Sequence, residues 1–149
     1  MIQVENEQQS FEEWYIQVIR IYHAINQLTE SYGLNYEQYL ILKKVSQDNA
    51  IEVMKLAQIL AVSNPAISRK VNVLYGKKLI TKERKDESDQ RKVFIALSET
   101  GQQVTRRLTA QLDELLRAYQ QQHHTDLGQL FDETKQLESF LAKEIQKMD

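Results

Sequence analysis

The chain has 149 residues, of which 42% are hydrophobic and 27% are charged, and this composition is typical of a folded domain rather than a disordered segment. It contains no cysteine, which excludes disulfides, thiolate metal sites, a cysteine nucleophile and thiol-based redox sensing. Four glycines and one proline are too few for a loop-rich β-sandwich, so we expect a mainly helical fold.

No apolar run approaches the roughly 20 residues that a membrane span needs. The N-terminal sequence is polar and acidic and shows no secretory signal. We therefore expect a cytoplasmic protein without a membrane partner.

The net charge of −2 hides an uneven distribution along the chain. Residues 62–92 carry 9 basic and 4 acidic side chains, whereas residues 1–50 and 93–149 are both net acidic. A phosphate backbone is attracted by local positive potential, so the basic block indicates a nucleic-acid surface. A solvated lysine-rich face is the alternative, and charge alone does not separate the two.

The first predicted element is a long amphipathic helix. Apolar residues, many of them aromatic, recur every three or four positions from Phe11 to Tyr32. Ser10 and Glu13 have the spacing of a capping box, which predicts the start of the helix, and Gly33 predicts its end.

Three shorter helices are expected next. One begins near Asn35, and a second, of about two turns, runs from Val53 to Ala61. Ser63 then caps a third helix that has Pro65 in its first turn and a buried stripe of Ile67, Val71 and Leu74. Two short helices joined by so few residues must cross steeply, as in a helix-turn-helix.

From Ile80 onward the apolar period changes from that of a helix to that of a strand. The runs 80–84 and 93–97 are β-rich, and the segment between them is polar, which predicts a β-hairpin with a charged tip. With the helix pair, this hairpin makes a winged helix-turn-helix over residues 50–98.

Two helices are expected after the hairpin. Ser98 or Thr100 caps the first, and the chain turns around 123–126 before the second. Their apolar surface and that of the first helix exceed what the short helices can cover, which predicts a homodimer, with a monomeric helical bundle as the alternative. Residues 1–49 and 99–149 are then the helical dimerisation region, and 50–98 the DNA-binding region.

The segment from Ser63 to Lys70 has the side chains that a recognition helix needs. Asn64 and Ser68 are short enough for the helix to approach a groove closely, and Arg69 and Lys70 can reach phosphates or guanine edges. An ordinary capped amphipathic helix is the alternative reading of this segment alone.

The tip of the hairpin carries Arg91, two residues after Asp89. An arginine there can enter a minor groove, where the negative potential attracts guanidinium groups. Asp89 would act structurally, by capping the turn or pairing with an arginine. A surface ion pair of Arg91 with Asp86 or Asp89, worth little energy, is the alternative.

These motifs resemble the multiple-antibiotic-resistance regulator (MarR) family of winged-helix regulators over nearly the whole chain. Residues 86–91 are similar to the Asp-x-Arg wing motif of that family, and 97–101 to its strand-to-helix junction. One departure is Lys78, at a place where many members have glycine. The sequence 64–69 and the residue before Arg91 are similar to the staphylococcal teicoplanin-associated regulator branch.

The resemblance implies a dimer formed by the terminal helices, a recognition helix in the major groove and a wing arginine in the minor groove. The candidate DNA-binding residues are Ser63, Asn64, Pro65, Ser68, Arg69, Lys70, Arg84, Arg91 and Lys92.

The family also implies a cleft for a small aromatic or anionic ligand between the dimerisation helices and the winged unit. Its candidate lining is Trp14, Tyr15, Tyr22, Tyr36, Tyr39 and Met54. Ordinary core and interface aromatics are the alternative for any one of them. We expect no metal site, because adjacent His123 and His124 point apart on a helix, and no cofactor.

No phosphate loop, nucleophile elbow or paired carboxylates indicate an enzyme. The sequence predicts a dimeric, sequence-specific regulator of transcription that binds double-stranded DNA, a repressor released from a pseudo-palindromic operator by a small ligand. The alternative is a winged-helix module that binds proteins or small molecules but not DNA. A steep dependence of DNA affinity on salt would distinguish them.

Overall fold

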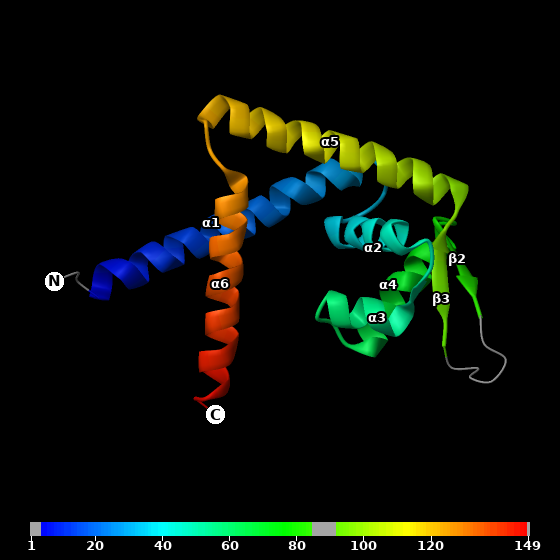
Figure 1. The fold of residues 1–149 in the computed structure, drawn as a ribbon, viewed down its shortest axis with the longest axis horizontal. Helices are drawn as coiled ribbons and strands as arrows, with labels where there is room; N and C mark the ends of the chain where they lie inside the picture. Colours follow the sequence, from blue (N-terminus) through cyan, green and yellow to red (C-terminus); the bar gives the residue numbers. More distant parts are fainter. Residues whose placement is uncertain (1–3, 85–91, 149) are drawn as a thin grey trace. The chain divides into compact units, whose positions relative to one another are not determined.

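The computed structural model describes residues 4–84 and 92–148, and within them the chain is mainly helical (Figure 1). The chain forms two compact units, Met1–Thr109 and Ala110–Asp149. The elements are α1 (Val4–Glu30), α2 (Tyr36–Asp48), β1 (Ile51–Glu52), α3 (Val53–Ile59), α4 (Asn64–Gly76), β2 (Ile80–Glu83), β3 (Phe94–Leu97), α5 (Glu99–His123) and α6 (Leu127–Gln146). The predicted fold class, mainly α with a small β wing, is confirmed.

Helix α1 begins earlier than the sequence predicted. Ser10 lies inside the helix, where its hydroxyl donates to the carbonyl oxygen of Asn6 at 2.7 Å, so the capping box at Ser10 is wrong. The Glu- and Gln-rich residues before Ser10 are good helix formers and continue the helix. The predicted end is confirmed, because Gly33 has φ +68° and follows Glu30, the last helical residue.

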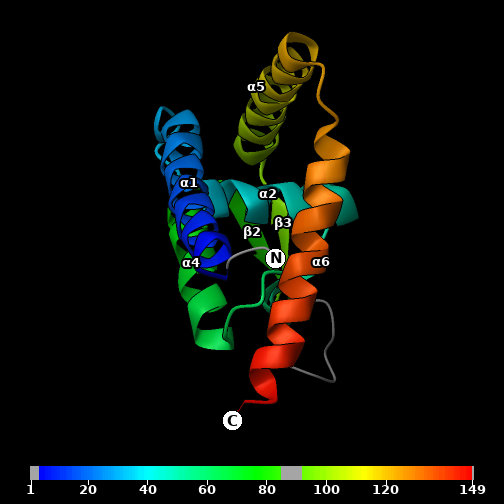
Figure 2. The same cartoon turned by 90° about the vertical axis from the view of Figure 1, so that its left-hand side faces the viewer.

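Helices α2, α3 and α4 lie where the sequence predicted three short helices. Asn35 caps α2 in a capping box with Gln38, and α2 lies beside β3, as both views show (Figures 1 and 2). Helices α3 and α4 pack on each other, and Leu56 of α3 and Ile67 of α4 are both fully buried. Ala61, in the turn between them, has a left-handed φ of 52°.

The wing is a three-stranded antiparallel sheet in the order β1-β3-β2. The predicted hairpin is confirmed, with Ile80 opposite Leu97. The sequence did not predict β1, whose Ile51 pairs with Ile95. The backbone N–H of Val53 also donates to the carbonyl of Val93 at 2.9 Å, so α3 begins hydrogen-bonded to the wing.

A tight junction joins the end of α4 to the start of α5. The Ser98 hydroxyl donates to the carbonyl oxygen of Lys78 at 2.8 Å and accepts from the N–H of Gly101 at 3.0 Å, so Ser98 is the cap. A Cβ on Gly101 would lie 2.0 Å from the carbonyl oxygen of Leu79, so only glycine fits there. Lys78 itself has φ +59°, the left-handed conformation that glycine adopts most easily.

The second unit contains the C-terminal part of α5 and all of α6. Asp126 caps α6 by accepting a hydrogen bond from the N–H of Gly128 at 2.8 Å, after the predicted turn. Leu127 is buried, but Phe131 and Phe140 are more than half exposed. None of the helices in residues 4–84 and 92–148 is long and apolar enough to cross a membrane.

Candidate nucleic-acid interface

Helix α4 has two chemically different faces. Ile67, Val71 and Leu74 are at most 2% exposed and hold the helix on its own unit, as predicted. Asn64, Pro65, Ser68 and Arg69 are all exposed on the opposite side. In the first two turns of α4, the exposed face is therefore polar and made of short side chains, apart from one arginine.

The first turn of α4 is fixed by its own cap. The hydroxyl of Ser63 accepts from the N–H of Ala66 at 3.3 Å, and Pro65 occupies an early position where a missing N–H costs nothing. Ser63 is exposed, but its hydroxyl oxygen already accepts this hydrogen bond from the first turn of the helix.

Lys70 and Arg69 have different surroundings. The ammonium of Lys70 pairs with the carboxylate of Glu37 on α2, and its side chain is 30% exposed. Arg69 is exposed, and its guanidinium has no hydrogen-bond or ion-pair partner among residues 4–84 and 92–148. Arg69 is therefore available to DNA, whereas Lys70 would first have to leave Glu37.

The wing presents two of its predicted basic residues. Arg84 directly follows β2 and Lys92 lies just before β3, and both side chains are exposed. Arg91, with Asp86 and Asp89, lies outside the described residues, so its predicted role stays a prediction.

Two polar residues at this surface were missed by the sequence reasoning. Nζ of Lys82, on β2, donates to Oδ1 of Asn72, on α4, at 2.7 Å. The same ammonium lies 4.6 Å from the centre of the Tyr75 ring. The helical period could have found Asn72, since it lies one turn after Ser68, but the contact with Lys82 spans two elements.

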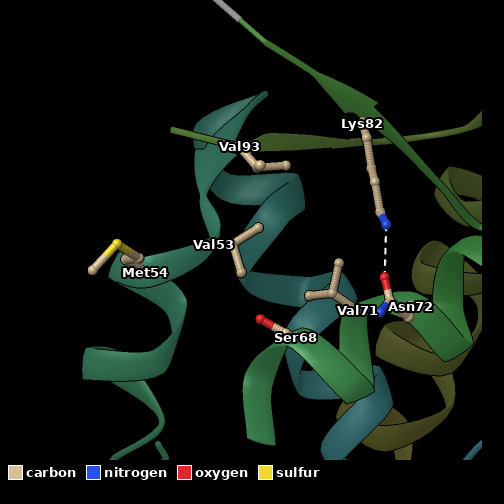
Figure 3. Close-up of a pocket in the computed structure, with 7 residues that line it drawn as sticks. All are labelled: Val53, Met54, Ser68, Val71, Asn72, Lys82 and Val93. Carbon is tan, nitrogen blue, oxygen red and sulfur yellow. Dashed lines mark hydrogen bonds between the residues drawn. The ribbon is translucent and has the colours of Figure 1, made fainter. Parts of the chain in front are cut away.

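An open cavity of about 290 Å³ lies between α3, α4 and the wing strands (Figure 3). Its walls combine apolar side chains with one ammonium, one hydroxyl and one amide. The lining residues are Val53, Met54, Ser68, Val71, Asn72, Lys82 and Val93. The cavity therefore opens beside the exposed face of α4.

The six residues predicted to line a ligand cleft have different environments. Trp14, Tyr15 and Tyr22 are 38%, 53% and 50% exposed on α1. Tyr39 is buried, and its hydroxyl lies 2.9 Å from that of Thr109. Two more residues complete the set: Tyr36 has its ring 5.4 Å from that of Tyr39, and Met54 lines the cavity beside α4 instead. The ligand cleft stays a prediction.

Tyr36 has a shifted pKa. Burial, and to a smaller extent the neighbouring Tyr39, raise the pKa of Tyr36 above its usual value. Its backbone N–H donates to Oδ1 of Asn26 at 2.8 Å, which joins α2 to α1. Within residues 4–84 and 92–148, no group of three or more acidic or histidine side chains could hold a metal ion.

A polar helix face above a buried apolar face, beside a basic hairpin, defines the class of this protein: it is a winged helix-turn-helix protein. The family described as transcriptional regulator SarA/Rot matches residues 23–108. The chain is 31% identical to the HTH-type transcriptional regulator MgrA of Staphylococcus aureus, over 89% of this chain and 83% of that protein.

The chain therefore belongs to the SarA/Rot family, and it is a DNA-binding transcriptional regulator rather than an enzyme. This confirms the predicted function class.

Solved structures show the same fold. Staphylococcus aureus MarR in complex with salicylate and kanamycin matches with a TM-score of 0.75 at 22% identity, over 94% of this chain and 95% of that one. A mutant MarR from Escherichia coli in complex with operator DNA matches with a TM-score of 0.69 at 19% identity, over 95% and 97%.

Proposed function

We propose that this regulator binds a pseudo-palindromic operator as a homodimer and represses transcription from it. In this proposal α4 enters the major groove with Asn64, Ser68 and Arg69, and the wing follows the neighbouring backbone with Arg84 and Lys92. The observation that carries the proposal is the division of α4 into a buried apolar face and an exposed polar face. We further infer that the chain lies near the teicoplanin-associated regulator branch, on the motif resemblance alone.

The proposed dimer is supported by the apolar surface that α1 leaves exposed in one copy of the chain. Every residue from Asn6 to Ala24 of α1 is exposed, and these include Phe11, Trp14 and Ile21. A soluble protein rarely leaves such a continuous apolar stripe in water, so a second copy of the chain is the partner that we propose for it. Residues 1–49 and 99–149 would then supply the interface, and 50–98 the DNA contacts.

The test begins with selection of binding sites from random double-stranded DNA. We expect two inverted half-sites about 10 base pairs apart, centre to centre, and an affinity that falls by several powers of ten as salt rises through the physiological range. A shallow salt dependence, or no preference over random DNA, would refute operator recognition and favour a protein-binding winged helix.

Arg69→Ala is the sharpest variant for this test. Because the guanidinium has no partner among the described residues, its removal should leave the fold intact and weaken operator binding roughly 5- to 100-fold. Arg107→Ala removes another exposed arginine, from α5, and should change the affinity less than about twofold. Equal effects of the two substitutions on affinity would show that α4 does not contact the DNA.

We also propose that a small aromatic or anionic ligand weakens operator binding by favouring a dimer in which the two α4 helices are wrongly spaced. The aromatic residues near the α1–α2 junction, and the salicylate bound to the Staphylococcus aureus MarR, support this proposal. Salicylate should release labelled operator from the protein, and Tyr22→Ala should reduce that release. Unchanged binding at saturating salicylate would refute salicylate as a ligand.

A reporter gene under the selected operator tests repression. Co-expression of the regulator should lower its output, and Arg69→Ala should restore it. A rise in output on co-expression would show an activator instead.

A further inference from the structure

Lys82 reaches from the wing to the exposed face of the recognition helix (Figure 3). Strand alternation explains its position, because Ile80 lies on the same side of β2 and is buried against the core. Two residues further on, the side chain of Lys82 extends beyond the core and meets α4. The strand that anchors the wing therefore also delivers an ammonium to α4.

The side chain that Lys82 meets belongs to the proposed DNA-binding face. Asn72 follows Ser68 by four residues and Arg69 by three, so the three lie on one face of α4. All three are exposed, and Ser68 and Asn72 line the same cavity. A base pair below this part of α4 would therefore meet the Asn72 amide.

The ammonium determines which half of that amide faces it. Lysine can only donate hydrogen bonds, so the oxygen of Asn72 must face Nζ, at 2.7 Å. The ring of Tyr75, 4.6 Å away, stabilises the ammonium in that position. The amide is thereby held with its oxygen bonded to Lys82, and among residues 4–84 and 92–148 its two N–H groups have no hydrogen-bond partner.

This arrangement changes what Asn72 can recognise. A free asparagine reads adenine with both ends, since its oxygen accepts from the adenine amino group and its nitrogen donates to N7. Beside a positive ammonium, the oxygen of Asn72 is a poor acceptor for a second amino group. The N–H donors that remain on the amide match the acceptors of guanine, O6 and N7.

We propose that Lys82 is a positioning residue for base recognition: its hydrogen bond to Oδ1 of Asn72 makes that amide a donor-only contact, which selects guanine over adenine at one position of each half-site. The inference rests on the proposed entry of α4 into the major groove. It assigns a role to a wing residue that is distinct from neutralising phosphate.

The experiment compares sites selected from random DNA by the wild-type protein and by Asn72→Ala, Lys82→Met and Lys82→Arg. The position whose preference disappears in Asn72→Ala marks the base that Asn72 contacts. We expect guanine there for the wild-type protein, adenine for Lys82→Met and guanine again for Lys82→Arg, which retains a donor. The guanine-to-adenine affinity ratio should fall roughly 5- to 100-fold in Lys82→Met.

Salt dependence separates this role from a simple phosphate contact. Loss of a phosphate contact lowers affinity for all sequences and reduces the slope of log affinity against log salt by about 1. If Lys82 acts through Asn72, Lys82→Met changes the base preference, and on an Asn72→Ala background it changes neither preference nor affinity. Lys77→Met, which removes another exposed lysine near the end of α4, should leave the preference unchanged.

Three results would overturn the inference: an unchanged preference in Lys82→Met, a uniform loss of affinity with a reduced salt slope, or no position that depends on Asn72. Thermal unfolding of each variant checks that the fold is intact. Failure of the proposed function looks different, because the wild-type protein itself would then select no sequence.

Discussion

Helices α4 and α1 both carry an apolar stripe, but only α4 buries its stripe within the chain. Leu74 of α4 is fully buried, whereas Val18 of α1 is 39% exposed and Ile21 is 65% exposed. The difference shows that α4 is held by contacts already present in one copy, while most of α1 is left exposed, and in the proposed dimer a second copy covers it. Substitutions in the stripe of α4 should therefore change the free energy of unfolding. Substitutions in the stripe of α1 should change the dissociation constant of the proposed dimer.

The largest effect is expected at the junction that fixes the end of α4. Gly101→Ala would place a Cβ 2.0 Å from the carbonyl oxygen of Leu79, and backbone cannot move aside as a side chain can. We expect a loss of more than about 3 kcal/mol in the free energy of unfolding, measured by urea denaturation. Gly76→Ala is the control, because its Cβ would meet nothing within 4 Å and alanine favours a helix. A similar loss in both variants would mean that the junction does not hold α4.

Leu74→Ala tests directly whether α4 is stabilised within one copy. Removing this fully buried side chain should lower the free energy of unfolding by about 3 kcal/mol. The difference from wild type should be the same at every protein concentration, because the contacts that are lost lie inside one copy. Val73→Ala, at a 45% exposed position of the same helix, should change the stability by less than about 0.5 kcal/mol.

Val18→Glu tests whether the apolar stripe of α1 forms the proposed dimer interface. A carboxylate in the middle of the stripe would be buried without a partner in the dimer, so the dissociation constant of the dimer should rise at least tenfold, or about 1.4 kcal/mol. Analytical ultracentrifugation measures the dimer, and circular dichroism at high protein concentration checks the helices. Gln9→Glu adds the same charge about two and a half turns earlier, on the other side of α1, and should leave the dimer intact. Equal weakening by both charges would refute the assignment of the stripe as the interface.

The smallest effect is expected from the backbone at the end of α4. Lys78 has φ +59°, so Lys78→Gly should relieve its strain and raise the free energy of unfolding by about 0.5 kcal/mol, after the greater flexibility of glycine in the unfolded chain is counted. Lys77→Gly removes the same charge from a residue with φ −79° and should instead lower the stability by about 0.5 to 1 kcal/mol. Thermal unfolding at one fixed protein concentration measures both, and a loss in Lys78→Gly would contradict the argument.

Local patterns in the sequence predicted α4 correctly. Ser63 and Pro65 mark its start, and the spacing of Ile67, Val71 and Leu74 gives its buried face. Each of these signals acts over a few residues, which is the range at which sequence reasoning works.

Contacts between distant segments could not be predicted in the same way. The pair of Lys70 with Glu37 joins residues 33 positions apart, and Lys82 meets Asn72 from a different element. Strand β1 has only two residues, too few for an alternating pattern, and becomes visible only through its pairing with β3. The error at Ser10 has another cause, since a serine with cap spacing also fits inside a helix when strong helix formers precede it.

Strand β3 lies between β1 and β2, and thereby ties the start of α3 and the end of α4 to one central strand. A bend of the wing relative to the helix pair would break backbone hydrogen bonds on both of its sides. The wing and the helix pair should therefore move as one rigid body. In the proposed dimer, a ligand that releases the operator would then change the distance between the two winged units and leave the structure of each one unchanged.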